Sequence, residues 1–290
     1  MTSSGAVIYP HFAETKGLAI IINEFTWIPN REGDRIGSDI DAQNLEELFK
    51  AMNFEIYEGG TIVDLKKDEI VERLKAFAND KRHMKYDSCI VVIMGHGDDG
   101  TICDIHGEEI DIDHEILSLF NGDNAGDLVE KPKFFIFQAC RGGNSDAGAV
   151  ISSHQQEVNR QKLSSFLKYQ SGMVLNKISN LLLKKSPAHG SQRVPIYSDF
   201  FVFYATVPTM VSYRHWTGSE FIDSISKVFY KFAHKYDLED MAIIIKRRVG
   251  SQEIKIINKQ TQEEEIKFQQ PQFVTTNSKK YFMFPSVHIE

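Results

Sequence analysis

The chain has 290 residues, of which 42% are apolar and 25% charged, and this composition excludes disordered and low-complexity proteins. The formal charge of -7 argues against nucleic acid as a partner, because binding to phosphates depends on cationic side chains. Three scattered cysteines form no disulfide framework and suit a reducing compartment. Since no apolar run is long enough to cross a bilayer and residues 1–12 lack a signal-peptide pattern, we expect a cytoplasmic protein.

Strand and helix patterns alternate from the start of the chain, which predicts an α/β fold with a mostly parallel sheet. The apolar run at 17–22 predicts a strand that is buried on both faces. Ser38 is expected to cap the next helix, with Asp41 reaching back, because apolar residues then recur at helical spacing. The elements expected next are a strand at 54–57, a helix at 66–79 and a buried strand at 89–94.

The second half of the chain begins with an apolar strand at 134–137. From Asn144 to Arg193 the pattern dissolves into sequence rich in Ser, Gln and Lys. The alternation then resumes, and we expect a strand at 200–204, helices at 219–234 and 238–249, and a last strand at 281–284. Because no internal repeat is present, the interruption is predicted to separate two halves of one sheet.

Two loops that follow buried strands carry the residues of a candidate catalytic site. His96 lies between glycines after the strand at 89–94, and Cys140 precedes Arg-Gly-Gly after the strand at 134–137. Open α/β sheets bind ligands at these carboxyl ends of strands. A thiolate can attack a carbonyl there while an imidazole transfers protons, and the glycines let backbone N–H groups approach the oxyanion. Taken singly, however, such a cysteine is more often an inert buried thiol.

The residues around Cys140 change this interpretation. The run Gln138-Ala139-Cys140-Arg141-Gly142, with a histidine 44 positions upstream, matches the signature of caspases. The chain resembles this family over nearly its whole length, about residues 16–285, with further matches in the family's order at 17–23, 35–39, 95–97, 204–208 and 212–214.

The resemblance implies a caspase-like three-layer sandwich, in which a mostly parallel central sheet of about six strands is flanked by helices. It divides the chain into a short N-terminal segment at 1–15, a large-subunit part at 16–146, an intersubunit linker at 147–193 and a small-subunit part at 194–290. It also implies a cysteine endopeptidase that cleaves protein substrates after aspartate, without a cofactor or metal, in apoptotic or developmental proteolysis.

The same resemblance implies roles for individual residues. Cys140 is the expected nucleophile and His96 the general acid/base, while the backbone N–H groups of Gly97 and Cys140 form the oxyanion hole. The expected substrate-binding residues are Arg35, Gln138, Ser212, Tyr213 and Arg214. Two guanidinium groups suit the carboxylate of a substrate aspartate, because each can form bidentate, charge-assisted hydrogen bonds with it.

Two departures from the family pattern lie at positions that contact substrate residues other than the aspartate. Tyr213 stands where the family usually has Trp, although it can still wall an apolar pocket. Glu220 stands where many members have an aromatic residue that shapes the pocket for the fourth substrate residue. The preference of this chain for the fourth substrate residue therefore cannot be inferred from its relatives.

Two other functions would require different residues in the site. The first is a caspase-fold pseudoenzyme or regulatory partner, which would lack a catalytic or pocket residue. The second is a related protease that cleaves after Arg or Lys, which would need an acidic pocket. Cys103 and His106 offer two zinc ligands, but no second pair lies at suitable spacing, so a hairpin is the plainer interpretation. The run at 263–265 is interpreted as a solvated face of a late loop.

Three further expectations concern assembly and processing. The strand at 281–284 is expected to pair with its symmetry mate in a homodimer, because three aromatic residues make a poor exposed edge. Self-processing is expected at Asp146, which ends the large-subunit part, because residues 147–193 contain no aspartate and small residues follow Asp146. The linker segment at 160–185 is basic and has apolar residues at helical spacing; docking on an anionic membrane or an acidic partner is the alternative to a plain linker.

Overall fold

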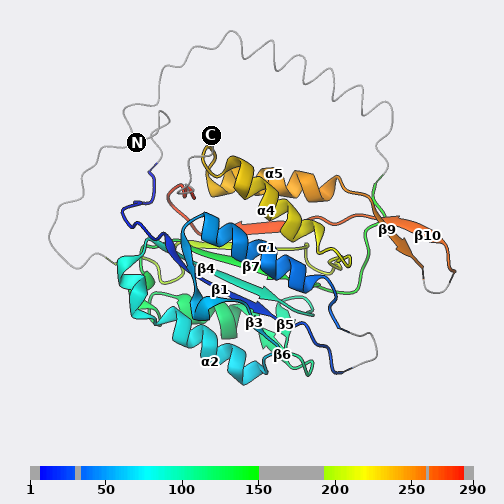
Figure 1. Cartoon of the computed structure of the whole chain (residues 1–290), viewed down its shortest axis with the longest axis horizontal. Coiled ribbons are helices and arrows are strands. Elements are labelled where there is room, and N and C mark those ends of the chain that lie inside the picture. Colours follow the sequence, from blue (N-terminus) through cyan, green and yellow to red (C-terminus); the bar gives the residue numbers. More distant parts are fainter. Residues whose placement is uncertain (1–6, 30–33, 150–192, 259–260, 284–290) are drawn as a thin grey trace, which may run out of the picture.

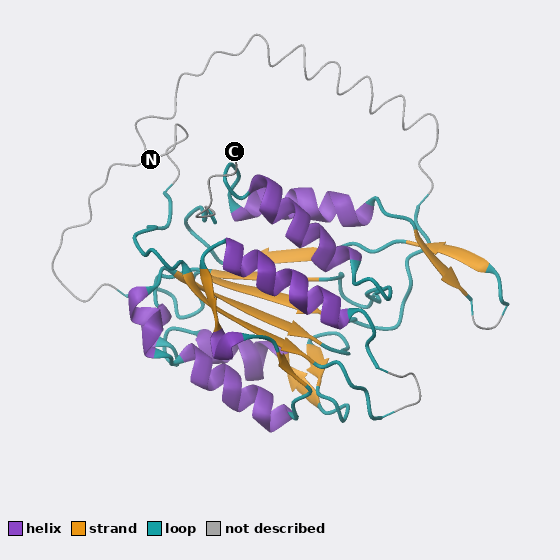
Figure 2. Cartoon of the chain, viewed as in Figure 1, coloured by secondary structure: helices purple, strands orange, loops and turns teal. Residues whose placement is uncertain are grey.

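A central sheet between two layers of helices forms the body of the molecule (Figures 1 and 2). The computed structural model describes residues 7–29, 34–149, 193–258 and 261–283. The expected linker segment at 160–185 and Phe284 lie outside these residues. Within them, no helix is long and apolar enough to cross a membrane.

The sheet has seven strands, six of them in the order β11-β8-β7-β4-β1-β2, with β3 also paired to β1. Every pair is parallel except β11 with β8, which is antiparallel. The predicted mostly parallel sheet is therefore present. The strands are β1 (Gly17–Asn23), β2 (Phe54–Ile56), β3 (Ile62–Val63), β4 (Ser88–Met94), β7 (Lys133–Gln138), β8 (Phe200–Tyr204) and β11 (Gln272–Thr275).

Each face of the sheet is covered by its own set of helices (Figure 1). One face holds α1 (Ser38–Ala51), α4 (Glu220–Phe232) and α5 (Leu238–Gly250). The other face holds α2 (Lys67–Ala78) together with the short helices. These are η1 (Tyr57–Gly59), η2 (Lys81–Lys85), η3 (Ile112–Ile116), η4 (Leu117–Phe120) and η5 (Gly126–Leu128).

The alternation of side chains along β1 explains why this strand is continuously apolar. Ala19 and Ile21 belong to the core under α1, α4 and α5, whereas Leu18, Ile20 and Ile22 belong to the core over α2. Successive residues of a strand point to opposite faces, so a strand with helices on both sides needs apolar residues at every position. The prediction of burial on both faces is confirmed.

The start of α1 differs from the expected cap. Gly37, with φ of 88°, occupies the N-cap position, and no side chain of the described residues caps the helix. Ser38 is the first helical residue, and its hydroxyl is buried without a hydrogen-bond partner in the part of the chain that the structure describes. The carboxylate of Asp41 instead accepts a hydrogen bond from the backbone N–H of Ser219. Asp41 was expected to bond to the start of its own helix, but it bonds to a segment that is distant in the sequence.

The expected last strand at 281–284 is wrong. In its described part, residues 281–283, the backbone belongs to no strand, and the edge of the sheet is β11. Tyr281 and Met283 are buried in the core beside α4 and α5, and the Tyr281 hydroxyl donates to Ser88 Oγ. These two buried side chains are two positions apart, so the sequence shows the period of a strand although the segment is irregular.

Two hairpins of the described residues lie outside the central sheet. One joins β5 (Thr101–Cys103) and β6 (Glu109–Asp111), so the hairpin interpretation of Cys103 is confirmed. The other joins β9 (Ile254–Ile257) and β10 (Glu264–Lys267) and projects from one end of the molecule (Figures 1 and 2). Glu264 and Glu265 are thus strand residues, which corrects the expected loop, although Glu264 is exposed as expected.

Candidate active site

The register of β4 and β7 brings the two predicted loops together. Met94 pairs with Gln138 at the carboxyl ends of these strands, and the N–H of Gly95 donates to the Gln138 carbonyl at 3.2 Å. His96 and Cys140 therefore leave the sheet side by side. Both line a cleft of about 690 Å³, and its walls include the other predicted substrate-binding residues, which are Arg35, Gln138, Ser212, Tyr213 and Arg214.

Cys140 is half-buried, and the backbone of Ser212 holds its sulfur in place. The N–H of Ser212 donates to Sγ at 3.3 Å, and the thiol lies 3.6 Å from the Ser212 carbonyl, to which it can donate. The backbone of Gly97 lies close by, since a Cβ there would be 3.2 Å from the Cys140 carbonyl. The loops that carry the two predicted oxyanion-hole residues are thus in contact.

The glycine two positions after Cys140 is required by a close backbone approach. Gly142 has φ of 136°, and a Cβ on it would lie 2.5 Å from the carbonyl oxygen of Thr209. The segment after the cysteine is held in the same region, because Arg141 N–H donates to the Met210 carbonyl and Asn144 N–H to that of Thr209. Only glycine combines this conformation with this contact.

His96 lies against an indole that sequence reasoning did not single out. The imidazole and Trp27 have ring centroids 4.2 Å apart. Burial and the positive charges of Arg35 and Arg214 lower the pKa of His96 to about 4. The imidazole is therefore neutral at pH 7 and able to accept a proton. Trp27 lies in an irregular segment with no periodic pattern, so no sequence signal connected it with His96.

Arg35 lies at the bottom of the cleft and is only 1% exposed. Its Nη1 donates to Asn23 Oδ1 at 3.1 Å and to the Glu24 carbonyl at 2.9 Å. Its Nε and Nη2 are buried and have no hydrogen-bond partner among the described residues. Burial and the charge of Arg214 lower the pKa of Arg35. Two nearby cations with unused donors favour an anionic ligand in the cleft.

The other walls of the cleft come from the segment before α4. Nε of Arg214 donates to the Ile36 carbonyl at 3.0 Å, and Gln138 Nε2 donates to Ser212 Oγ at 3.1 Å. The backbone N–H of Tyr213 donates to Oε1 of Gln269, whose Nε2 donates in turn to the Ala205 carbonyl. Gln269 is buried, and sequence reasoning missed it because it lies in a polar run without motif or period.

Arg141 connects the catalytic loops with the edge of the sheet. Its Nη2 lies 3.1 Å from Asp99 in the His96 loop, and its guanidinium lies 4.2 Å from the ring centroid of Tyr204 on β8. Its Nη1 donates to the side chain of Gln272, the first residue of β11. One side chain of the Cys140 loop therefore contacts the His96 loop and two strands.

The remaining predicted residues lie outside the cleft. Asp146 is half-buried; its carbonyl accepts from Phe268 N–H at 2.9 Å and its carboxylate from Gly148 N–H at 2.8 Å. Glu220 is exposed at the start of α4. Cys103 is buried in β5, and the described part of the chain contains no group of three His, Cys, Asp or Glu side chains arranged to hold a metal ion.

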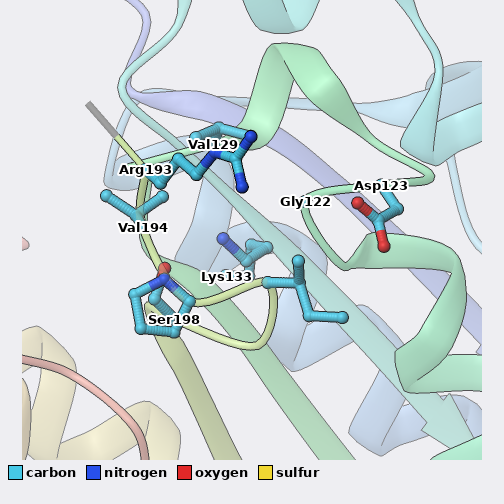
Figure 3. A pocket seen from close by; sticks show the side chains of 9 residues that line it. Gly122, Asp123, Val129, Lys133, Arg193, Val194 and Ser198 are labelled. Atoms are coloured by element: carbon cyan, nitrogen blue, oxygen red, sulfur yellow. The ribbon is translucent and has the colours of Figure 1, made fainter. Parts of the chain in front are cut away.

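A second cavity, of about 350 Å³, lies at the other end of β7 (Figure 3). Lys133, the first residue of that strand, lines it together with Arg193 and Asp123. The Lys133 ammonium group donates to the carbonyls of Leu128 and Lys131. Because β7 separates this cavity from Cys140, it belongs to no part of the candidate site.

Comparisons with known proteins identify relatives of the chain and structures with the same fold. A family model described as a caspase domain matches residues 16–282. Caspase-3 of Mesocricetus auratus is 30% identical over 254 residues, 87% of this chain and 77% of the relative. Caspase-2 of Gallus gallus is 28% identical over 247 residues, 84% of this chain and 54% of the relative. The crystal structure of caspase-1 from Spodoptera frugiperda has the same fold, with a TM-score of 0.77 at 20% identity, covering 98% of this chain and 96% of that one.

Proposed function

Because this chain belongs to the caspase family, whose domain spans residues 16–282, we propose that it is an active endopeptidase that cleaves protein substrates after aspartate. One observation carries the proposal: Arg35 is buried on the cleft that Cys140 lines, with two donors that have no partner among the described residues, and Arg214 lies on the same cleft. A substrate carboxylate would occupy these donors. It would also compensate two charges that are otherwise costly to bury.

The proposed reaction begins with proton transfer from the Cys140 thiol to the neutral imidazole of His96. The thiolate attacks the backbone carbonyl carbon of the substrate aspartate, and the N–H groups of Gly97 and Cys140 stabilise the oxyanion. His96 then gives its proton to the leaving amine as the C–N bond breaks, which leaves a thioester on Cys140. Water, deprotonated by His96, hydrolyses the thioester and restores the thiol.

The side chain of Gln138 completes the proposed pocket. Its Nε2 donates to the Ser212 hydroxyl, and its Oε1 is buried with no partner within the described ranges. Rotation of the amide by half a turn would let the hydroxyl donate to Oε1 and direct Nε2 to the substrate carboxylate. Ser212 and Tyr213 would border the residues before the substrate aspartate. Glu220 is too exposed to take the place of an aromatic wall.

Two alternatives receive less support. A pseudoenzyme would lack part of the machinery, yet Cys140, His96, Arg35 and Arg214 all line one cleft. A protease that cleaves after Arg or Lys would need negative charge where this cleft presents two guanidinium groups. The family favours a role in apoptotic or developmental proteolysis. All three cysteines are free thiols, which supports the expected cytoplasmic location.

The proposed assembly is a homodimer that joins two sheets through β11, in place of the segment at 281–284. The outer edge of β11 pairs with no other strand of the described residues, and an open edge of this kind is suited to pairing with a second copy of the chain. Asp146 remains the proposed processing site. Its backbone bond to Phe268 would have to open before the Asp146–Ala147 bond entered another molecule's cleft.

Identifying which peptide bonds the enzyme cleaves in a mixed peptide library tests this function. We expect the wild-type protein to cut after Asp and the Cys140→Ala variant to cut nothing. Mass spectrometry of the purified protein, with Asp146→Ala as the comparison, tests processing at that residue. Cleavage by Cys140→Ala, or cuts after basic residues, would contradict the proposed function.

A further inference from the structure

Asp41 is a buried acidic residue close to the two arginines of the cleft. It lies in the first turn of α1 and is 1% exposed. Its Oδ1 accepts a hydrogen bond from Ser219 N–H at 2.9 Å, whereas Oδ2 is buried and has no partner among the described residues. A half-satisfied buried carboxylate is costly unless positive charge compensates it.

Arg35 and Arg214 supply that charge. Neither guanidinium takes part in a salt bridge within the described ranges; their hydrogen bonds go to neutral oxygens of Asn23, Glu24 and Ile36. Burial raises the pKa of Asp41 to about 6, while the hydrogen bonds from Ser219 and the charges of both arginines act in the opposite direction. Asp41 is therefore mostly ionised at pH 7.

The other buried carboxyl group near Arg35 does not contribute a full charge. Burial raises the pKa of Glu24 to about 8, so this side chain is mostly protonated at pH 7. The net charge that the protein contributes to the pocket is consequently set by three groups. Two guanidinium groups and one carboxylate leave a single net positive charge.

Asp41 also joins the two chain segments that carry the arginines. Arg35 comes just before α1, and Arg214 comes just before α4. These segments meet at two hydrogen bonds, Arg214 Nε to the Ile36 carbonyl and Ser219 N–H to Asp41. They are pressed together at Gly37, where a Cβ would lie 2.2 Å from the His215 carbonyl oxygen. The spacing of the arginines therefore depends on this contact.

We propose that Asp41 is a positioning residue of the aspartate pocket. Its carboxylate fixes the Arg214 segment against α1, and its charge reduces the pocket from two net positive charges to one, which matches a single substrate carboxylate. This inference rests on the proposed specificity for aspartate. It predicts that a pocket without the Asp41 charge binds small anions from solution, which then compete with substrate.

Asp41→Asn tests the charge separately from the hydrogen bond, because the amide oxygen can still accept from Ser219. We expect kcat for an Asp-containing peptide to stay within about twofold of wild type, while KM rises about tenfold between low and high sodium chloride concentrations. The wild-type KM should change far less. Asp39→Asn is the matched control, because Asp39 is an exposed acid in the same helical turn.

Asp41→Ala removes the hydrogen bond as well, and its KM should exceed that of Asp41→Asn about tenfold at every salt concentration, with normal thermal unfolding as the check on its fold. Wild-type kinetics in Asp41→Ala, or equal chloride dependence in Asp41→Asn and wild type, would overturn the inference. If Asp41→Ala does not fold, Asp41→Asn decides alone. Failure of the wild-type enzyme to prefer Asp would instead overturn the proposed function, so the two failures are distinguishable.

Discussion

The imidazole of His96 lies near the same two arginines that would receive the substrate, so substrate binding should change its pKa. In the free enzyme, burial and these cations lower that pKa to about 4. Activity is lost as the pH falls through this pKa, because a protonated imidazole accepts no proton. A bound carboxylate offsets the cations and raises the pKa.

We therefore expect the acid limb of kcat, which reports the enzyme–substrate complex, to lie at higher pH than the acid limb of kcat/KM, which reports the free enzyme. Steady-state kinetics across the acid range measures both limbs. Coincident limbs, or a kcat/KM limb at the ordinary histidine value of about 6.5, would show that the arginines do not influence His96.

Gly142 offers a second test at the scale of one residue. Gly142→Ala should lower the free energy of unfolding by about 1–3 kcal/mol because of the backbone conformation alone. The contact between the new Cβ and Thr209 should lower it further. Turnover should also fall, because the change displaces the segment next to Cys140. Gly143→Ala is the control, since a Cβ at Gly143 meets no atom within 4 Å. Equal urea midpoints for the two variants would refute this account of the motif.

The sequence predicted those site residues that a motif marks. Cys140, His96, Arg35 and Arg214 stand in runs whose order identifies them, and all four line the cleft. Trp27, Gln269 and the contact of Asp41 with Ser219 were not predictable in this way. Each depends on a partner far away in the sequence, and no local pattern reports such a partner.

Among the elements, long periodic segments were predictable and short ones were not. The helices and the strands buried on both faces carry enough apolar residues to define a period, and they are present close to their expected bounds. β11 has only four residues, flanked by polar sequence, so no period distinguishes it. The segment at 281–283 has the opposite property, a strand-like alternation that comes from burial alone.

The edge strand β11 carries the prediction for assembly. Val274→Asp should shift the protein from dimer to monomer and lower activity with it, because charges at a strand edge oppose pairing with a second copy. Val274 is 44% exposed in the single chain, and Val63, 53% exposed on β3, provides the matched control as Val63→Asp. Sedimentation velocity measures the assembly. A fully active monomer of the wild-type chain would contradict the proposed dimer.

At the scale of the whole molecule, the alternation of strand and helix was sufficient to predict one mostly parallel sheet covered on both faces. Because the two halves of the chain contribute neighbouring strands β7 and β8, the interruption between them does not divide the fold. The division into subunits, processing at Asp146 and the properties of the segment at 160–185 depend on residues that are mostly outside the described ranges. They remain predictions from sequence.

The ratio of kcat/KM for two peptides that differ only in Asp or Asn at the cleaved position tests the central claim most directly. The two side chains have nearly the same shape, so the ratio isolates the charge that Arg35 and Arg214 would recognise. We expect the Asp peptide to be favoured by about 1000-fold, or ~4 kcal/mol, because Asn leaves buried cations without a counter-charge. A ratio within about tenfold, at most ~1.4 kcal/mol, would contradict an aspartate-directed peptidase.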